Sequence, residues 1–160
     1  MGFKGIVFAS VVLFLQVPLR QLDFLIGSWK GSLQTNSGTA SISLENKRTY
    51  RDNFISSMIR TGVPGILSAN ESCYIWWDGA AGVFRSWAAS DLSEQPREDV
   101  GKLKDGSLAM VSLPWAVRGV TQTTMRTFTL LPGGKLRLRL DVRQGDTWIK
   151  QAEADLVRAK

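Results

Sequence analysis

The feature that most constrains this chain is an alternation of apolar and polar residues with a period of two, which runs through almost everything after residue 28. Between residues 136 and 142, Leu and Val alternate with Arg and Asp, and between residues 40 and 45, Ala, Ile and Leu alternate with Ser and Glu. Alternation of this kind is typical of a strand that turns one face to a core and the other to water. The chain is therefore predicted to be all-β.

Turn signals divide the alternating stretches into short strands. Asn36-Ser37-Gly38, Asp78-Gly79 and Asp105-Gly106 supply Gly, Asn or Asp where a hairpin needs a positive φ. Strands are expected at 28–36, 39–51, 53–61, 66–77, 82–90, 97–104, 107–113, 122–131, 135–144 and 147–157. Regular hairpin spacing without crossover helices favours a single antiparallel up-and-down β-barrel of about ten strands, and a strongly curved sandwich is the alternative.

Three segments are not expected to be strands. A short apolar helical turn is predicted at 22–26, where Gly27 would end it. Residues 91–99 and 114–119 are expected to form the longer loops. The acidic residues of the first loop, Asp91, Glu94, Glu98 and Asp99, are interpreted as solvated.

The amino terminus has the pattern of a targeting segment. Lys4 precedes a 13-residue apolar run from Gly5 to Val17 that contains one polar amide, as in a secretory signal. The run is shorter than the roughly 20 residues that a membrane-spanning helix needs, and no small-x-small cleavage site follows it. We predict a signal peptide or membrane-targeting segment at 1–21 and a barrel domain at 22–160. The protein would be exported to the periplasm or outside the cell, with membrane contact only through this segment if it is uncleaved.

Composition excludes several kinds of chemistry. The chain has no His, which excludes Ser-His-Asp and Cys-His catalysis and His-ligated zinc or haem. A single cysteine, Cys73, excludes an intramolecular disulfide and a CxxC motif, and it is expected to be a buried small hydrophobe. No nucleophile elbow, dinucleotide fingerprint or phosphate loop is present. The charged residues behind the formal net charge of +6 are scattered along the chain, and aromatic residues are not interleaved with the basic ones. We predict a non-enzymatic protein without cofactor, metal or nucleic-acid partner.

The segment LDFLIGSWKG at 22–31 resembles the opening of calycin-type barrels, which include lipocalins, fatty-acid-binding proteins and nitrobindin-like proteins. It is most similar to that of an uncharacterised bacterial family of unknown function, and Trp76-Trp77-Asp78-Gly79 is similar to an aromatic hairpin in that family. The resemblance implies that the helical turn plugs one end of the barrel and that Trp29 packs over its base. Gly31 would let a neighbouring element approach closely. Haem-binding relatives use a histidine, so their haem chemistry does not carry over.

The resemblance also suggests where a ligand would bind. Fatty-acid-binding proteins hold a ligand carboxylate with an inward arginine, often beside a tyrosine. Here Arg60 follows Met58 at two-residue spacing, Arg85 lies between Val83 and Trp87, and Arg48 shares a face with apolar residues of its strand. The predicted ligand-binding residues are Trp29, Arg48, Tyr50, Arg60, Tyr74, Trp76, Arg85 and Trp87.

Two functions from different classes follow. The first is a barrel that binds a small hydrophobic or amphipathic molecule in its interior, which the inward arginines would favour. The alternative is a barrel filled by its own side chains that acts as a protein-interaction module without a ligand, which the Leu-rich inward faces and bulky Trp residues favour. Exposed Trp side chains would be compatible with a homodimer as well as a monomer.

Overall fold

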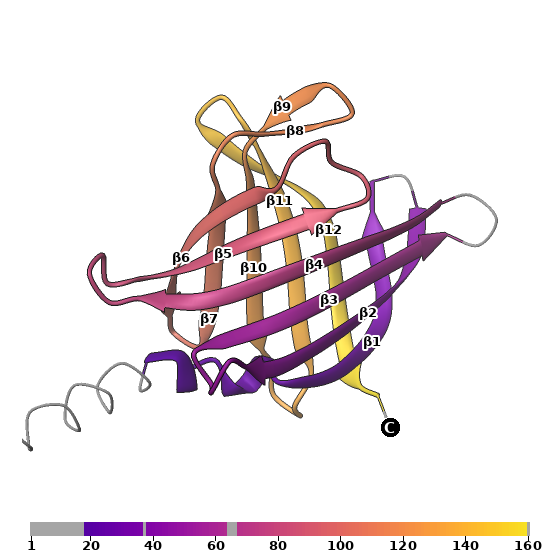
Figure 1. Cartoon of the computed structure of the whole chain (residues 1–160). Coiled ribbons are helices and arrows are strands. Elements are labelled where there is room, and N and C mark those ends of the chain that lie inside the picture. Colours follow the sequence, from indigo (N-terminus) through magenta and orange to yellow (C-terminus); the bar gives the residue numbers. More distant parts are fainter. Residues whose placement is uncertain (1–17, 37, 64–66, 160) are drawn as a thin grey trace, which may run out of the picture.

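The computed structural model describes residues 18–36, 38–63 and 67–159, and the predicted targeting run at 1–17 lies outside them. The described chain is a closed, ten-stranded, antiparallel up-and-down barrel, which confirms the predicted fold class (Figure 1). The barrel strands are β1 (Gly27–Thr35), β2 (Gly38–Thr49), β3 (Phe54–Val63), β4 (Leu67–Asp78), β5 (Val83–Ser90), β6 (Arg97–Lys104), β7 (Ser107–Ser112), β10 (Thr124–Leu130), β11 (Leu136–Gln144) and β12 (Thr147–Arg158).

The barrel closes where the first and last strands meet. Each strand pairs with its sequence neighbour except at two places: β7 pairs with β10, and β1 pairs with β12, with Trp29 opposite Arg158. Between β7 and β10 the chain forms a separate hairpin of β8 (Trp115–Val117) and β9 (Val120–Gln122). The prediction of a loop at 114–119 was therefore wrong. Figure 1 shows this hairpin above the upper end of the barrel.

A helical segment closes the lower end, as the sequence predicted. A helical turn at 18–20 leads into the short 3₁₀ helix η1 (Asp23–Leu25), and the side chains of Leu19, Leu22 and Leu25 are buried in the barrel core. The Leu25 carbonyl accepts hydrogen bonds from Trp29 Nε1 and Asn46 Nδ2, both at 2.9 Å. The plug is thus fixed to β1 and β2, and the core begins before the predicted domain boundary at residue 22.

Two inward-facing glycines allow neighbouring strands to pack closely. A Cβ atom on Gly31 would lie 2.8 Å from Leu156 Cδ2 and 2.9 Å from the Asp155 carbonyl oxygen of β12. A Cβ on Gly101 of β6 would lie 2.5 Å from the Ala109 carbonyl oxygen of β7. Both separations are shorter than real Cβ contacts, so glycine is required at both positions.

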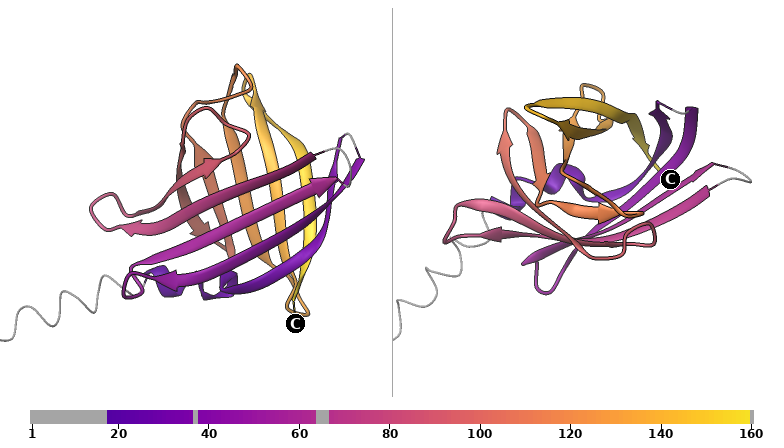
Figure 2. Two further views of the ribbon diagram at one scale, coloured as in Figure 1. Left: turned by 45° about the vertical axis from the view of Figure 1, so that its right-hand side comes forward. Right: turned by 90° about the horizontal axis from the view of Figure 1, so that it is seen from above.

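The interior differs between the two ends. Large apolar side chains and the plug fill the lower half, where the buried residues include Trp29, Leu44, Ile55, Ile75, Phe84, Leu108, Met110, Phe128, Leu136 and Leu156. Polar and charged side chains are buried higher up, beneath the loops of the upper end. Figure 2 shows the barrel from this upper end, with the strands surrounding the interior. Side chains thus fill the lower half of the barrel, and a cavity lies at its upper end.

Candidate functional site

Four charged side chains meet inside the barrel, and we call them the ion network: Glu71 of β4, Arg97 and Asp99 of β6, and Arg126 of β10. Arg97 donates from Nη1 and Nη2 to the two carboxylate oxygens of Glu71, at 2.8 and 3.0 Å, and from Nε to Asp99 at 2.9 Å. Arg126 donates from Nη2 to Asp99 at 2.8 Å and from Nη1 to Glu71. Each cation therefore bridges both anions, and the formal charges cancel.

Strand register explains why these residues meet. Asp99 lies opposite Ser86 of β5 and Ser112 of β7, and β7 in turn pairs with β10, which carries Arg126. All of these residues alternate inward together with the buried apolar residues of their strands. The Ser86 hydroxyl donates to Asp99 at 2.6 Å. The network is a polar layer across the barrel, and side chains from three strands, Ser86 of β5, Arg97 of β6 and Arg126 of β10, hold Asp99.

Electrostatics keep both carboxylates ionised despite their burial. Burial alone would raise the pKa of Glu71 and of Asp99, but Arg126 and Arg97 outweigh it and hold both pKa values below their ordinary range. The two carboxylates in turn raise the pKa of Arg126 against the effect of its own burial. Burial raises the pKa of the neighbouring Cys73 thiol, so this cysteine is an uncharged core residue, as predicted.

A cavity of about 420 Å³ lies at the upper end, and the ion network forms part of its floor. Glu71, Arg97 and Arg126 all line it. Most of its remaining wall is apolar, and a large part comes from the adjoining strands β11, β12, β1, β2 and β3: Leu33, Ile42, Ile59, Leu138, Leu140 and Ala152. Trp115 of β8 and Val117 line it too, so the hairpin is part of its enclosure.

Trp115 connects the hairpin to the network. The Arg97 guanidinium carbon lies 4.9 Å from the centroid of the Trp115 ring, a cation–π arrangement. The side chain is only 8% exposed. An isolated bridge between Ser93 and Val117 joins the hairpin to the 91–96 loop. The hairpin is therefore held at the cavity by two contacts, one with Arg97 and one with the 91–96 loop.

Two N–H donors at the cavity have no acceptor. Arg126 Nε and Trp115 Nε1 are buried and have no hydrogen-bond partner within the described residues. A buried polar group left without a partner costs about 1–3 kcal/mol. Both donors belong to side chains that line the cavity. A hydrogen-bond acceptor brought within reach of either atom would remove this cost.

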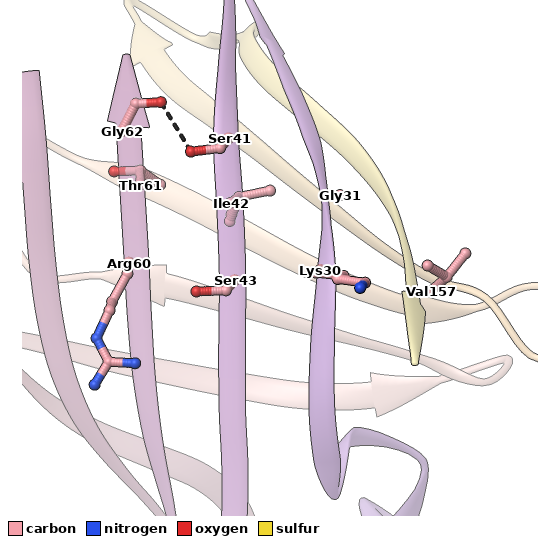
Figure 3. A pocket seen from close by; sticks show the side chains of 9 residues that line it. All are labelled: Lys30, Gly31, Ser41, Ile42, Ser43, Arg60, Thr61, Gly62 and Val157. Atoms are coloured by element: carbon pink, nitrogen blue, oxygen red, sulfur yellow. Dashed lines mark hydrogen bonds between the residues drawn. The ribbon is translucent and has the colours of Figure 1, made fainter. Parts of the chain in front are cut away.

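The prediction that Arg48, Arg60 or Arg85 lines the cavity needs correction, because all three lie outside it. Arg60 is exposed on the outer face of β3, opposite Ser43 of β2, where it borders an outer hollow of about 620 Å³ (Figure 3). Arg85 points outward and donates to Asp78 at 2.6 Å. Arg48 lies at the lower rim, where it pairs with Asp23 and donates to the Leu19 carbonyl at 3.3 Å.

The predicted aromatic residues are brought together, but on the outside of the barrel. Tyr50, Phe54, Tyr74, Trp76 and Trp87 line an outer hollow of about 440 Å³ on β3 to β5, and we call them the aromatic patch. Phe54 lies 5.7 Å from Tyr50 and 6.0 Å from Trp76 between ring centroids. Tyr50 is 63% and Trp87 39% exposed. The predicted residue Trp29 is buried separately at the base of the barrel, as expected.

Sequence reasoning missed all four members of the ion network. Asp99 was interpreted as part of a solvated loop, yet it is 2% exposed on β6. The available signal was alternation: Glu71 stands at two-residue spacing from Ala69 and Cys73, and Arg97 and Asp99 share a face with Gly101. Isolated buried charges are costly, so alternation alone does not favour an inward position for four charged side chains. Because the four side chains pair with one another, none of these charges is isolated.

Comparison with known proteins assigns neither a family nor a function to this chain. No family model and no curated protein matches the chain. Within the described ranges, no helix is long and apolar enough to cross a membrane. The same ranges hold no group of three or more His, Cys, Asp or Glu side chains that could bind a metal ion.

Proposed function

We propose that this barrel binds a small amphipathic molecule in its upper cavity, with the apolar part of the ligand against the strand walls and its polar end at the ion network. The observation that carries the proposal is the pair of buried donors without acceptors, Arg126 Nε and Trp115 Nε1, at a cavity with a mostly apolar wall. A concave apolar site with a few oriented polar groups is the usual form of a small-molecule site.

The wall supplies the affinity in this proposal. Leu33, Ile59 and Leu138 reach the cavity from three different strands, so a ligand placed there contacts apolar surface on the side of the barrel formed by β11, β12 and β1 to β3. Removing apolar surface from water contributes roughly 25 cal/mol per Å². A molecule of modest size would therefore gain enough free energy for binding without a covalent or ionic attachment.

The ion network supplies the orientation. Glu71 and Asp99 fix both arginines, and the Ser86 hydroxyl fixes Asp99. Donors that are already held in place lose little conformational entropy when a ligand arrives. The ion network would thus orient the ligand, with its polar end toward the network.

A cavity-filling variant tests this function. Full-length protein would be titrated with a neutral naphthylamine dye, and native mass spectrometry would identify any co-purified molecule. Ala152→Leu places three additional carbons in the cavity wall, where Ala152 is 5% exposed. We expect it to weaken dye binding by at least about tenfold. The matched control Ala89→Leu, in a half-buried position on the outer face of β5, should bind as the unaltered protein does. Equal binding by both variants, or no binding by the unaltered protein, would contradict the proposal.

Family and compartment belong to the same proposal. The opening motif at 22–31 and the apolar run at 5–17 support an exported bacterial protein of the calycin type. Detection of the chain in a periplasmic or extracellular fraction, in a form shortened or still carrying residues 1–21, would test this part. Retention of the full chain in the cytoplasm would contradict it.

The alternative function is an interaction module, which the aromatic patch favours. Contiguous exposed aromatics are uncommon on a monomer's surface and often mark a contact site. The occupant we consider is a second copy of this chain, joined through Trp87 and Tyr50. This alternative predicts a dimer in sedimentation velocity that Trp87→Ser disrupts and Trp148→Ser, a half-buried position on β12, does not. A monomer at all concentrations would contradict it.

A further inference from the structure

We infer that the polar end of the ligand is an uncharged oxygen acceptor, a carbonyl or a hydroxyl, and that Trp115 Nε1 and Arg126 Nε are the donors that receive it. The inference rests on the proposed binding function and specifies its ligand. It differs from the carboxylate that the resemblance to fatty-acid-binding proteins would suggest. Three features of the site support it, namely charge balance, donor geometry and the cost of burial.

The positive charges of the cavity are already matched. Arg97 uses Nε, Nη1 and Nη2 for hydrogen bonds to Asp99 and Glu71, and its guanidinium also stacks on Trp115. Arg126 uses both Nη atoms in the same way. Two guanidinium groups and two carboxylates leave no formal charge for a ligand to neutralise.

The unmatched groups are single N–H donors. Trp115 Nε1 and Arg126 Nε each carry one hydrogen and lack a partner among the described residues. Trp115 stacks on Arg97, and Arg97 shares both of its carboxylate partners with Arg126. The two donors therefore belong to adjoining side chains of one cluster. An uncharged oxygen within reach of either donor would supply the acceptor that it lacks.

A charged ligand end would disturb this arrangement. A carboxylate brought to the cavity floor would approach Glu71, whose carboxylate lines the same cavity. An ammonium group would approach Arg97 and Arg126 instead. In either case a buried charge would lack an unshared counter-ion, which is unfavourable. A neutral acceptor meets neither obstacle.

A matched ligand series tests the inference on the full-length protein. Decanol, methyl decanoate, decanoate and decylammonium all have an unbranched chain of ten carbons, counting the carboxyl carbon, and differ at the polar end. Each would compete against a neutral naphthylamine dye at neutral pH, with dye fluorescence as the readout. We expect decanol and methyl decanoate to displace the dye at concentrations at least about tenfold lower than either charged ligand does.

Trp115→Phe tests the assigned donor. It keeps an aromatic ring over Arg97 and removes the N–H. Loss of one hydrogen bond should weaken binding of methyl decanoate by about fivefold. Binding of decane, which has no oxygen, should weaken by a smaller factor, because only the packing of the ring against it changes. Trp148→Phe, outside the cavity lining, is the control and should affect neither ligand.

The possible failures are distinguishable. Tighter binding of decanoate than of decanol would overturn the neutral-acceptor inference and leave the proposed function intact. Equal loss of decane and methyl decanoate binding in Trp115→Phe would show that the ring acts by packing alone and would overturn the donor assignment. If none of the four ligands displaces the dye in the unaltered protein, the proposed function fails and the inference fails with it.

Discussion

Glu71 and Asp99 have the central place among the residues of this barrel, because each accepts hydrogen bonds from both arginines of the ion network. A barrel interior of this size is usually filled by apolar side chains. Here a charged layer stands between a packed lower half and an open upper half. Such a layer is weak evidence for stability gained over an apolar core, but the loss of one member leaves a partner charge buried and unmatched.

Glu71→Gln is expected to destabilise the fold substantially. The substitution keeps the shape of the side chain and removes one of the two negative charges, so Arg97 and Arg126 must share Asp99. Breaking a buried ion pair on one side costs about 3 kcal/mol. Urea unfolding followed by circular dichroism would measure the difference. Asp155→Asn, which breaks the solvent-exposed pair with Arg137, is the control and should cost far less. Equal losses in the two variants would contradict the burial argument.

The ion network also predicts the acid stability of the protein. The pKa values of Glu71 and Asp99 are lowered from 4.5 and 3.8, so the folded state binds fewer protons than the unfolded state in this range. Their contribution to stability is fully present above those ordinary values and is lost as the pH falls through the lowered ones.

Unfolding free energies measured from pH 7 to pH 3 should therefore decrease on acidification. The decrease should be shallower in Glu71→Gln, which lacks one of the titrating groups. Parallel pH profiles for the two proteins would contradict the assignment of lowered pKa values to the network.

At the scale of elements, the strands were largely predictable from the sequence. Asp105 and Gly106 adopt positive φ at the turn that the sequence predicted there, whereas at the Asp78-Gly79 turn the positive φ belongs to Gly82. Strand ends agree with the prediction to within a few residues. The β8–β9 hairpin was missed because three-residue strands are too short for alternation to be recognised. Its turn is also unusual, since Arg118 and Gly119 adopt positive φ values of 49° and 78° and Arg is uncommon there.

The close contact between β6 and β7 gives a prediction for Gly101. Gly101→Ala should destabilise the barrel by about 1–3 kcal/mol, because the new methyl group would press on the Ala109 carbonyl oxygen and on Met110. Thermal unfolding would detect the change. Lys102→Ala, the exposed neighbour on the same strand, should change stability far less. A neutral Gly101→Ala would mean that β6 and β7 separate more easily than their packing indicates.

At the scale of the whole molecule, the site could not be predicted, because over part of the barrel aromatic side chains face outward and charged side chains face inward. The outer face of β4 carries Tyr74 and Trp76, whereas its inner face carries Glu71. The resemblance to fatty-acid-binding proteins placed Arg85 inside, and the interpretation of residues 91–99 as a solvated loop left Asp99 outside. Only pairing between strands far apart in sequence shows that the buried charges neutralise one another, and a single strand pattern does not contain that information.

The central claim is that a ligand sits in the upper cavity beside Trp115, and nuclear magnetic resonance of the indole N–H groups tests it most directly. The chain has six Trp residues, and Trp115→Phe identifies one of their indole signals by its disappearance. On titration of the full-length protein with decanol, we predict a saturable change that is largest for the Trp115 signal. Changes confined to Trp76 and Trp87 would place the ligand on the aromatic patch and contradict the account.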